Sequence, residues 1–323
     1  MRGPRSEGMR TWLVAAVVAA VVLATGAWPA AGQGPDPVRL GTVERDVVYA
    51  TVGGVALMLD VHYPASAQGP APVAVYVHGG GWTGGDKSSG AGMADKDELL
   101  ARGYIVAAVN YRLAPQHKWP AQIQDVKAAV RFLRASAARF GLDPARIGAW
   151  GGSAGGHLVA MLGTTDASAG FDDSGGNLEQ SSRVLAVVDL FGPADLTASD
   201  WGLDRSPTAW QVFGATSPAD PVLVQASPVT WVSRDDPPFL ILHGDKDATV
   251  PVSQSVTLDA VLRAAGVPSR LVVVANAGHG FRPVGGDPAP SRAELTTMLA
   301  EFLDRHVRGI AGTGRVRRRL PPS

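Results

Sequence analysis

Ser153 is the residue whose type and surroundings most clearly indicate chemistry. Gly151, Ser153 and Gly155 match the pattern G-x-S-x-G. An apolar run over 147–150 precedes them and suits a buried strand, and apolar residues recur at helical spacing over 158–162. In a strand-turn-helix of this kind the turn forces the serine into strained backbone geometry, so its flanking residues must lack a Cβ atom. The pattern alone also fits many glycine-rich turns, but this context favours a serine nucleophile.

A serine hydroxyl needs a base, and His279 is the candidate. It lies in the short loop N-A-G-H-G-F after the last predicted strand. Reactive groups of an α/β sheet gather where the strands end, at the carboxyl edge. The remaining histidines fall in a glycine-rich loop, on the helix after Ser153, or at positions where a structural histidine is the more common finding: His62, His78, His117, His157, His243 and His306.

The carboxylate that orients this base is expected after the preceding strand. The segment H-G-D-K-D-A-T-V-P offers Asp245 and Asp247. In such a turn the nearer aspartate can brace the loop while the further one reaches the imidazole, so we predict Asp247 as the acid. The resulting order of serine, aspartate and histidine along the chain is typical of one class of hydrolases built on an α/β sheet.

The run H-G-G-G-W over 78–82 can supply donors for a developing oxyanion. Adjacent glycines let backbone N–H groups turn toward one point, and the N–H of Ala154 would join them at the start of the helix after the serine. One such donor can stabilise a transition state by about 3 kcal/mol. A phosphate-binding loop is the weaker alternative, because no lysine followed by serine or threonine has the required spacing.

The elements that must position these residues alternate along the chain. Two β-rich runs over 47–51 and 55–61 flank Gly53 and Gly54 and indicate an antiparallel hairpin at a sheet edge. Strands that are apolar throughout and separated by helices predict a parallel sheet covered on both faces. The further predicted strands are 72–77, 105–109, 147–150, 184–190, 239–242 and 271–274. The predicted helices are 93–102, 126–133, 255–264 and 292–306, together with one after Ser153 that includes 158–162.

The stretch 193–236 lacks clear periodicity and is interpreted as an insertion that forms a small cap. Its aromatic residues either line the substrate pocket or form the core of the cap. With Trp82 of the glycine run, we take Trp201, Trp210 and Phe213 as candidate substrate contacts. The insertion is short and carries charges and prolines, which predicts a small pocket, a preference for acyl chains of about two to six carbons, and no activation at an oil surface.

Composition excludes several other classes. The chain has 323 residues, a formal net charge of zero and no cysteine. It therefore has no disulfide or thiol chemistry, and no overall field that favours nucleic acid or a membrane surface. Asp172, Asp173 and Asn177 faintly resemble a calcium loop, but their spacing is wrong for one, and we predict no metal and no cofactor.

The termini predict processing and export. Arginines precede an apolar run over 12–24 that is followed by small residues, which is typical of a secretory signal peptide. We expect a signal peptide over 1–32 cleaved near Ala27 to Gly32, a linker over 33–37, a catalytic domain over 38–310 and a disordered basic tail over 311–323. The alternative is an uncleaved membrane anchor, although the run is short and interrupted by glycine and proline.

Several motifs in order along 38–307 carry a family resemblance: H-G-G-G-W, Y-R-L-A-P-Q-H-K-W-P-A, G-G-S-A-G-G-H-L, S-P-V-T-W-V, H-G-D-K-D-A-T-V-P and A-G-H-G-F. The chain resembles α/β-hydrolase esterases of the hormone-sensitive-lipase-like type, especially the bacterial feruloyl-esterase-like (BD-FAE-type) branch. The resemblance implies an α/β-hydrolase fold with Ser153 as nucleophile, Asp247 as acid and His279 as base. It places the oxyanion hole at Gly80, Gly81 and Ala154.

Other family positions are expected to have structural roles. The resemblance suggests that Tyr111, Arg112 and Asp125 brace the fold. Lipase-type members usually carry an acidic residue before the nucleophile, where this chain has Gly152.

The function expected from this resemblance is that of a secreted serine carboxylesterase. It would cleave short-acyl or aryl esters of small molecules through an acyl-enzyme, without a nucleic-acid partner or a stable membrane partner. A secreted peptidase of the same fold and a catalytically silent binding protein are the alternatives. The natural ester and the oligomeric state stay open.

Overall fold

The computed structural model describes residues 39–67, 69–201, 207–217 and 219–310. The expected signal peptide, linker and basic tail lie outside these residues. Within the described ranges, no helix combines the length and the apolar character needed to cross a bilayer.

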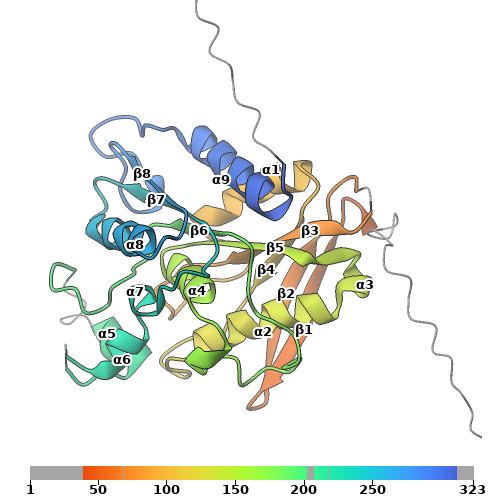
Figure 1. Ribbon diagram of the computed structural model, residues 1–323, viewed down its shortest axis with the longest axis horizontal. Helices are drawn as coiled ribbons and strands as arrows, with labels where there is room; N and C mark the ends of the chain where they lie inside the picture. The colour runs from red at the N-terminus through yellow and green to blue at the C-terminus, as the bar shows by residue number, and fades with distance from the viewer. Residues whose placement is uncertain (1–38, 68, 202–206, 218, 311–323) are drawn as a thin grey trace, which may run out of the picture. The chain divides into compact units, whose positions relative to one another are not determined.

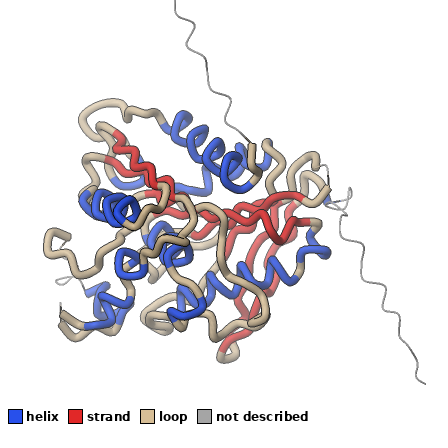
Figure 2. The backbone as a smooth tube through the Cα atoms, viewed as in Figure 1, coloured by secondary structure: helices blue, strands red, loops and turns tan. Residues whose placement is uncertain are grey.

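One eight-stranded sheet organises the fold, with strand order β1-β2-β4-β3-β5-β6-β7-β8 (Figures 1 and 2). The β1–β2 and β2–β4 pairs are antiparallel, and every later pair is parallel. This mostly parallel sheet with an antiparallel edge hairpin agrees with the sequence prediction. The strands are β1 (Val43–Val52), β2 (Val55–His62), β3 (Ala71–Val77), β4 (Ile105–Val109), β5 (Leu142–Gly152), β6 (Val187–Leu190), β7 (Phe239–Gly244) and β8 (Ser269–Val274).

Helices cover both faces because the central strands are apolar on both sides. In β3, Val73, Val75 and Val77 belong to one buried cluster, whereas Ala74 and Tyr76 belong to another. This is the two-residue alternation of a strand between two helical layers. The first layer contains α2 (Ala121–Ala135), α4 (Ala154–Thr164) and α8 (Ser253–Ala264), and the second contains α1 (Lys96–Ala101) and α9 (Arg292–Val307) (Figure 1).

Three local features differ from the sequence prediction. The predicted helix 93–102 is a 3-10 helix, η2 (Ala91–Asp95), followed by the short α1. The strand predicted over 184–190 is regular only in β6, although the Leu185 N–H still bonds to the Ile147 carbonyl at 2.8 Å. The insertion contains short helices, α5 (Pro207–Phe213), α6 (Pro221–Gln225) and α7 (Pro228–Trp231), each of which begins at a proline that fits the first turn of a helix.

Candidate active site

Ser153 occupies the sharp turn between β5 and α4. Its backbone has φ 57° and ψ −123°, a left-handed conformation that costs energy for a residue with a side chain. A Cβ atom on Gly151 would lie 2.5 Å from the Gly155 carbonyl oxygen, and one on Gly155 would lie 2.1 Å from the Val77 carbonyl oxygen. The flanking glycines are therefore required by the close approach of strand and helix, as the sequence pattern predicts.

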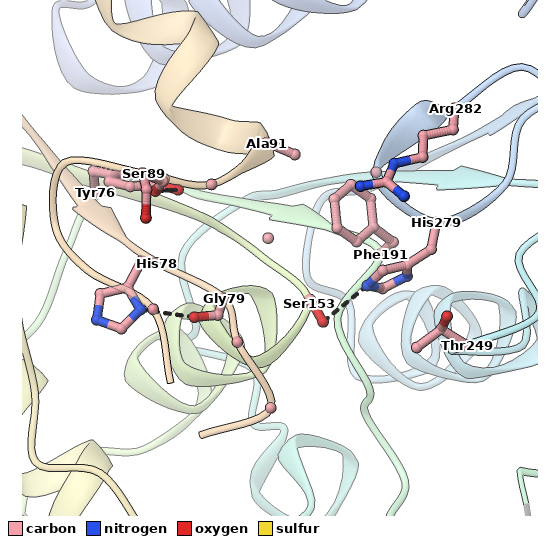
Figure 3. A pocket seen from close by; sticks show the side chains of 16 residues that line it. Tyr76, His78, Gly79, Ser89, Ala91, Ser153, Phe191, Thr249, His279 and Arg282 are labelled. Carbon is pink, nitrogen blue, oxygen red and sulfur yellow. Dashed lines mark hydrogen bonds between the residues drawn. The ribbon is translucent and has the colours of Figure 1, made fainter. Parts of the chain in front are cut away.

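The structure brings Ser153, His279 and Asp247 together (Figure 3 shows the first two). Ser153 Oγ lies 3.0 Å from His279 Nε2, and His279 Nδ1 lies 2.7 Å from Asp247 Oδ2. Asp247 follows β7, and His279 begins a short 3-10 helix, η5 (His279–Phe281), after β8. With its proton on Nδ1, the imidazole donates to the carboxylate and presents Nε2 to the serine hydroxyl as an acceptor. This arrangement can remove the hydroxyl proton.

The Asp247 carboxylate is held ionised from several sides. Its side chain is fully buried, which by itself would raise its pKa, but hydrogen bonds with His243 and His279 and from the Val250 N–H outweigh burial and hold the pKa well below its ordinary value. Its Oδ1 also accepts from the Thr249 N–H at 2.8 Å. The carboxylate can thus stabilise a positive charge that forms on the imidazole.

Asp245 and His243 have supporting positions around this carboxylate. Asp245 Oδ1 accepts a hydrogen bond from the Ala277 N–H at 3.3 Å and so braces the turn. His243 is buried, with Nδ1 at 2.7 Å from Ser255 Oγ and Nε2 at 2.9 Å from the Val250 carbonyl. His243 ties the start of the acidic turn to α8, so its position agrees with the structural role that the sequence suggests.

The glycine run lies beside Ser153 at the end of β3. Gly80 and Gly81 have φ 113° and 59° and line the same cavity as the serine. Within the described part of the chain, the N–H groups of Gly80, Gly81 and Ala154 donate to no protein acceptor. Three backbone donors close to Ser153 thus have no protein acceptor, which is what an oxyanion hole requires.

Tyr111 fixes the start of this loop. Its hydroxyl donates to the His78 carbonyl at 2.9 Å, and its ring stacks on the His78 imidazole with centroids 4.3 Å apart. Next along the chain, the Arg112 guanidinium pairs with the Asp125 carboxylate at 2.7 Å, which ties this segment to α2. These contacts fit the bracing role that we expected for the three residues.

A cavity of about 860 Å³ opens in front of Ser153. Tyr76, Ser89 and Ala91 form one wall and Phe191 and Arg282 the opposite one, on the side of His279 (Figure 3). Sequence reasoning did not identify these wall residues. Position on the carboxyl edge could have indicated Phe191, which directly follows β6, and Arg282, which lies just beyond His279.

The four aromatic residues proposed as substrate contacts, Trp82, Trp201, Trp210 and Phe213, are not among the residues that line this cavity. Trp82 and Phe213 are buried and meet edge to face with ring centroids 5.2 Å apart. Trp201 and Trp210 pack against the same apolar core, and the Trp201 indole N–H donates to the Thr249 carbonyl.

The physical reason is the path of the insertion. It packs down onto α4 and α8, with Leu223 and Ala226 in the shared core, and none of its described residues lines the cavity in front of Ser153. Its aromatic residues therefore belong mainly to the core, which was the other interpretation of their sequence.

Gly152, the departure from lipase-type members, also has a structural explanation. A Cβ atom at this position would lie 3.1 Å from the Phe191 ring. The space that a side chain would occupy before the nucleophile is thus taken by an aromatic wall of the pocket.

Metal binding finds no support among the described residues, which contain no group of three or more histidine, aspartate and glutamate side chains able to hold an ion. Asp172, in the segment that resembles a calcium loop, instead pairs with the buried ammonium of Lys127 at 2.8 Å and with Arg131. Its ligand capacity is already used by these cations.

Comparison with known proteins gives consistent matches. The BD-FAE family model matches residues 59–262. Esterase LipC of Mycobacterium tuberculosis is 36% identical over 251 residues, which cover 73% of this chain and 59% of LipC. The probable carboxylic ester hydrolase LipM of the same organism is 35% identical over 250 residues, which cover 71% of this chain and 56% of LipM. This chain thus spans somewhat more than half the length of these relatives.

Solved structures match over more of their length. A truncated form of a carbohydrate esterase from gut microbiota has a TM-score of 0.75 and 30% identity, covering 85% of this chain and 100% of that one. Esterase 2 of Thermogutta terrifontis has a TM-score of 0.68 and 26% identity, covering 87% of this chain and 97% of that one. The shared architecture is the α/β-hydrolase fold.

Proposed function

Because this chain belongs to the BD-FAE family and has the α/β-hydrolase fold, we propose that it is a serine carboxylesterase that cleaves short-acyl or aryl esters through an acyl-enzyme. The observation that carries the proposal is the continuous chain of contacts from Ser153 Oγ to His279 at 3.0 Å and from His279 to Asp247 at 2.7 Å, beside an open cavity. Its relatives named as esterases support the same reaction class.

In the proposed reaction, Ser153 Oγ attacks the ester carbonyl while His279 Nε2 takes its proton. The N–H groups of Gly80, Gly81 and Ala154 stabilise the oxyanion. His279 then returns the proton to the alcohol oxygen, the alcohol leaves, and the acyl group stays on the serine. Water deprotonated by His279 attacks this acyl-enzyme and releases the acid, which regenerates the serine hydroxyl.

The first test is chemical labelling combined with substitution. An organophosphate such as paraoxon should phosphorylate Ser153, and peptide mass spectrometry should find the adduct there and not on Ser89. The latter lines the same cavity but donates its hydroxyl to the Asp86 carbonyl instead of to a histidine. Ser153→Ala should lose both the label and more than 99% of p-nitrophenyl acetate hydrolysis, with a melting temperature within a few degrees of wild type. A labelled Ser153→Ala protein, or one that retains more activity, would remove Ser153 from this role.

We also propose that the enzyme is exported. The basic and apolar N-terminal segment, followed by small residues up to Gly32, supports this proposal. Expression of the full chain in a bacterium, with N-terminal sequencing of the exported protein, should give a start between residues 28 and 33. Retention of the full-length chain in the membrane fraction would instead support the anchor.

A further inference from the structure

Arg282 is the one side chain with a permanent charge among the described residues that line the cavity. It follows the short 3-10 helix that begins at His279, and Figure 3 shows its guanidinium group turned inward at the same wall as Phe191. The residue is exposed. A substrate in the cavity would therefore meet this positive charge.

The guanidinium group of Arg282 also has no partner within the described part of the chain: no hydrogen bond, ion pair or ring contact involves it. Other arginines close to the site are engaged. Arg112 pairs with Asp125 at 2.7 Å, and Arg292, beyond Ala91, pairs with Asp95 at 2.7 Å. A guanidinium fork without an acceptor, at the wall of a binding cavity, is suited to a carboxylate of the ligand.

The rest of the cavity leaves this charge uncompensated. No aspartate or glutamate lines it. His78 is neutral near pH 7, because burial lowers the pKa of its imidazole. The carboxylate behind His279, that of Asp247, is fully buried and satisfied by its own partners. Arg282 therefore contributes the one permanent charge on the described cavity wall, and this charge would favour an anionic group over a neutral one.

The position of Arg282 also indicates which part of an ester it would contact. His279 must reach the alcohol oxygen to return the proton, so the alcohol leaves along the wall formed by the His279 loop. Arg282 lies three residues further along this loop. Gly80 and Gly81, the proposed oxyanion donors, belong to the loop after β3. The start of this loop, at His78 and Gly79, lies on the other side of Ser153 from His279 (Figure 3).

We propose that Arg282 binds a carboxylate on the alcohol portion of the ester, so that the enzyme selects esters of acidic alcohols over those of neutral ones. This inference rests on the proposed esterase function, and it adds a substrate class that the reaction alone does not specify.

The test compares two phenyl acetates of similar shape, 4-acetoxybenzoate and its neutral amide, 4-acetoxybenzamide. For each variant, kcat/KM for the anionic ester is divided by kcat/KM for the neutral ester. Comparing this ratio with that of the wild type cancels the intrinsic reactivity of the two esters. Arg282→Gln should lower this ratio about fivefold, the effect of one partly exposed ion pair, and Arg282→Glu should lower it further. Arg282→Lys should restore most of it. Salt at 1 M should reduce the wild-type ratio, because the screening length is then only about 3 Å.

Arg234→Gln is the matched control, since Arg234 is exposed and outside the cavity, and it should leave the ratio unchanged. An unchanged ratio in Arg282→Gln would overturn the proposal. If activity on both esters falls by the same factor, the role of Arg282 is merely structural. A second pair of esters places the anion on the acyl part: mono-4-nitrophenyl succinate is compared with the neutral 4-nitrophenyl butyrate. If Arg282→Gln loses selectivity only for this pair, the assignment to the alcohol part is overturned. Failure of the esterase function itself is distinguishable, because wild type would then cleave neither ester.

Discussion

Asp245 and Asp247 differ in role although the chain places them only two residues apart. Asp247 Oδ2 contacts the imidazole of His279 at 2.7 Å, whereas Asp245 Oδ1 accepts a long 3.3 Å hydrogen bond from the Ala277 backbone. A carboxylate in contact with the imidazole fixes its tautomer and stabilises its charged form during the reaction. A carboxylate on the backbone can only hold the turn.

Asp247→Asn should therefore lower kcat by several orders of magnitude, because the amide can stabilise the wrong tautomer of His279. Asp245→Asn should cost less than about tenfold, since an amide oxygen can still accept from the Ala277 N–H. Steady-state kinetics with p-nitrophenyl acetate measure both, and circular dichroism checks that each variant is folded. The reverse order of losses would show that the acid has been assigned to the wrong residue.

These residues could be predicted from the sequence because each belongs to a short motif at the end of a strand. Ser153 lies between glycines that the turn requires, and His279 and Asp247 lie in the loops that follow β8 and β7. Arg282 and Phe191 belong to no such motif. Their positions after β8 and β6 could indicate the carboxyl edge of the sheet, but whether they reach the cavity depends on how the two loops fold across that edge.

At the scale of elements, α4 connects the nucleophile to the insertion through a buried histidine. His157 Nε2 lies 2.7 Å from the Ala226 carbonyl, and its Nδ1 accepts from the Trp82 indole N–H at 3.1 Å. Both contacts are satisfied only by the neutral ring with its proton on Nε2. Burial is the main cause that lowers the pKa of His157 from 6.5 to about 4.

This contact predicts a loss of stability in mild acid. The unfolded chain binds a proton at this histidine below about pH 6.5, but the folded chain binds one only below about pH 4. The stability that it contributes is complete above pH 6.5 and falls as the pH drops from 6.5 to 4, by about 2 kcal/mol at pH 5. His62, whose pKa is lowered to about 4 by burial, adds to the same trend.

In urea unfolding at pH 7.5 and pH 5, His157→Gln should lose less stability between the two conditions than wild type does. It should also start from a lower value, because glutamine fits the two contacts less well. His117→Gln, which changes a half-buried histidine outside this contact, is the control and should keep the wild-type difference. If His157→Gln and wild type lose the same free energy, protonation of His157 does not contribute.

The insertion can be predicted from the sequence as an element, but the packing of its aromatic side chains cannot. Its length and its position after β6 correctly suggest a segment added to the sheet, but its lack of clear periodicity does not predict its three short helices. Its aromatic residues fit either a pocket or a core, since both bury large apolar side chains. Only the packing against α4 and α8 decides for the core.

For the described domain as a whole, the strand order explains why the site could be located in advance. β4 lies on one side of β3 and β5 on the other, so the order of the sheet reverses between β3 and β5. Loops on the two sides of such a switch point diverge and leave a crevice at the carboxyl edge. The glycine run follows β3 and Ser153 follows β5 at this crevice, so Ser153 lies beside Gly80 and Gly81, the residues proposed to bind the oxyanion.

The same arrangement determines how the enzyme should treat acyl chains of different length. The sequence predicts a short-chain preference from the character of the insertion, but the described insertion residues do not line the cavity, so the argument must rest on the cavity walls. These walls are glycine-rich, with Tyr76, Ala91 and Phe191 as their main apolar surface and the charged Arg282 on one side. Each added methylene contributes about 0.8 kcal/mol only while apolar wall remains to bury it.

We therefore expect kcat/KM for p-nitrophenyl esters to peak at acyl chains of about two to six carbons and then to fall. We also expect no jump in rate when the substrate exceeds its solubility and forms droplets. Phe213→Ala is the control, because Phe213 is buried in the core: the substitution should lower the melting temperature through the cavity that it leaves, without moving the maximum. A maximum at eight carbons or more, or a rate increase on droplets, would indicate an apolar surface that the open cavity does not provide, and would make the enzyme a lipase.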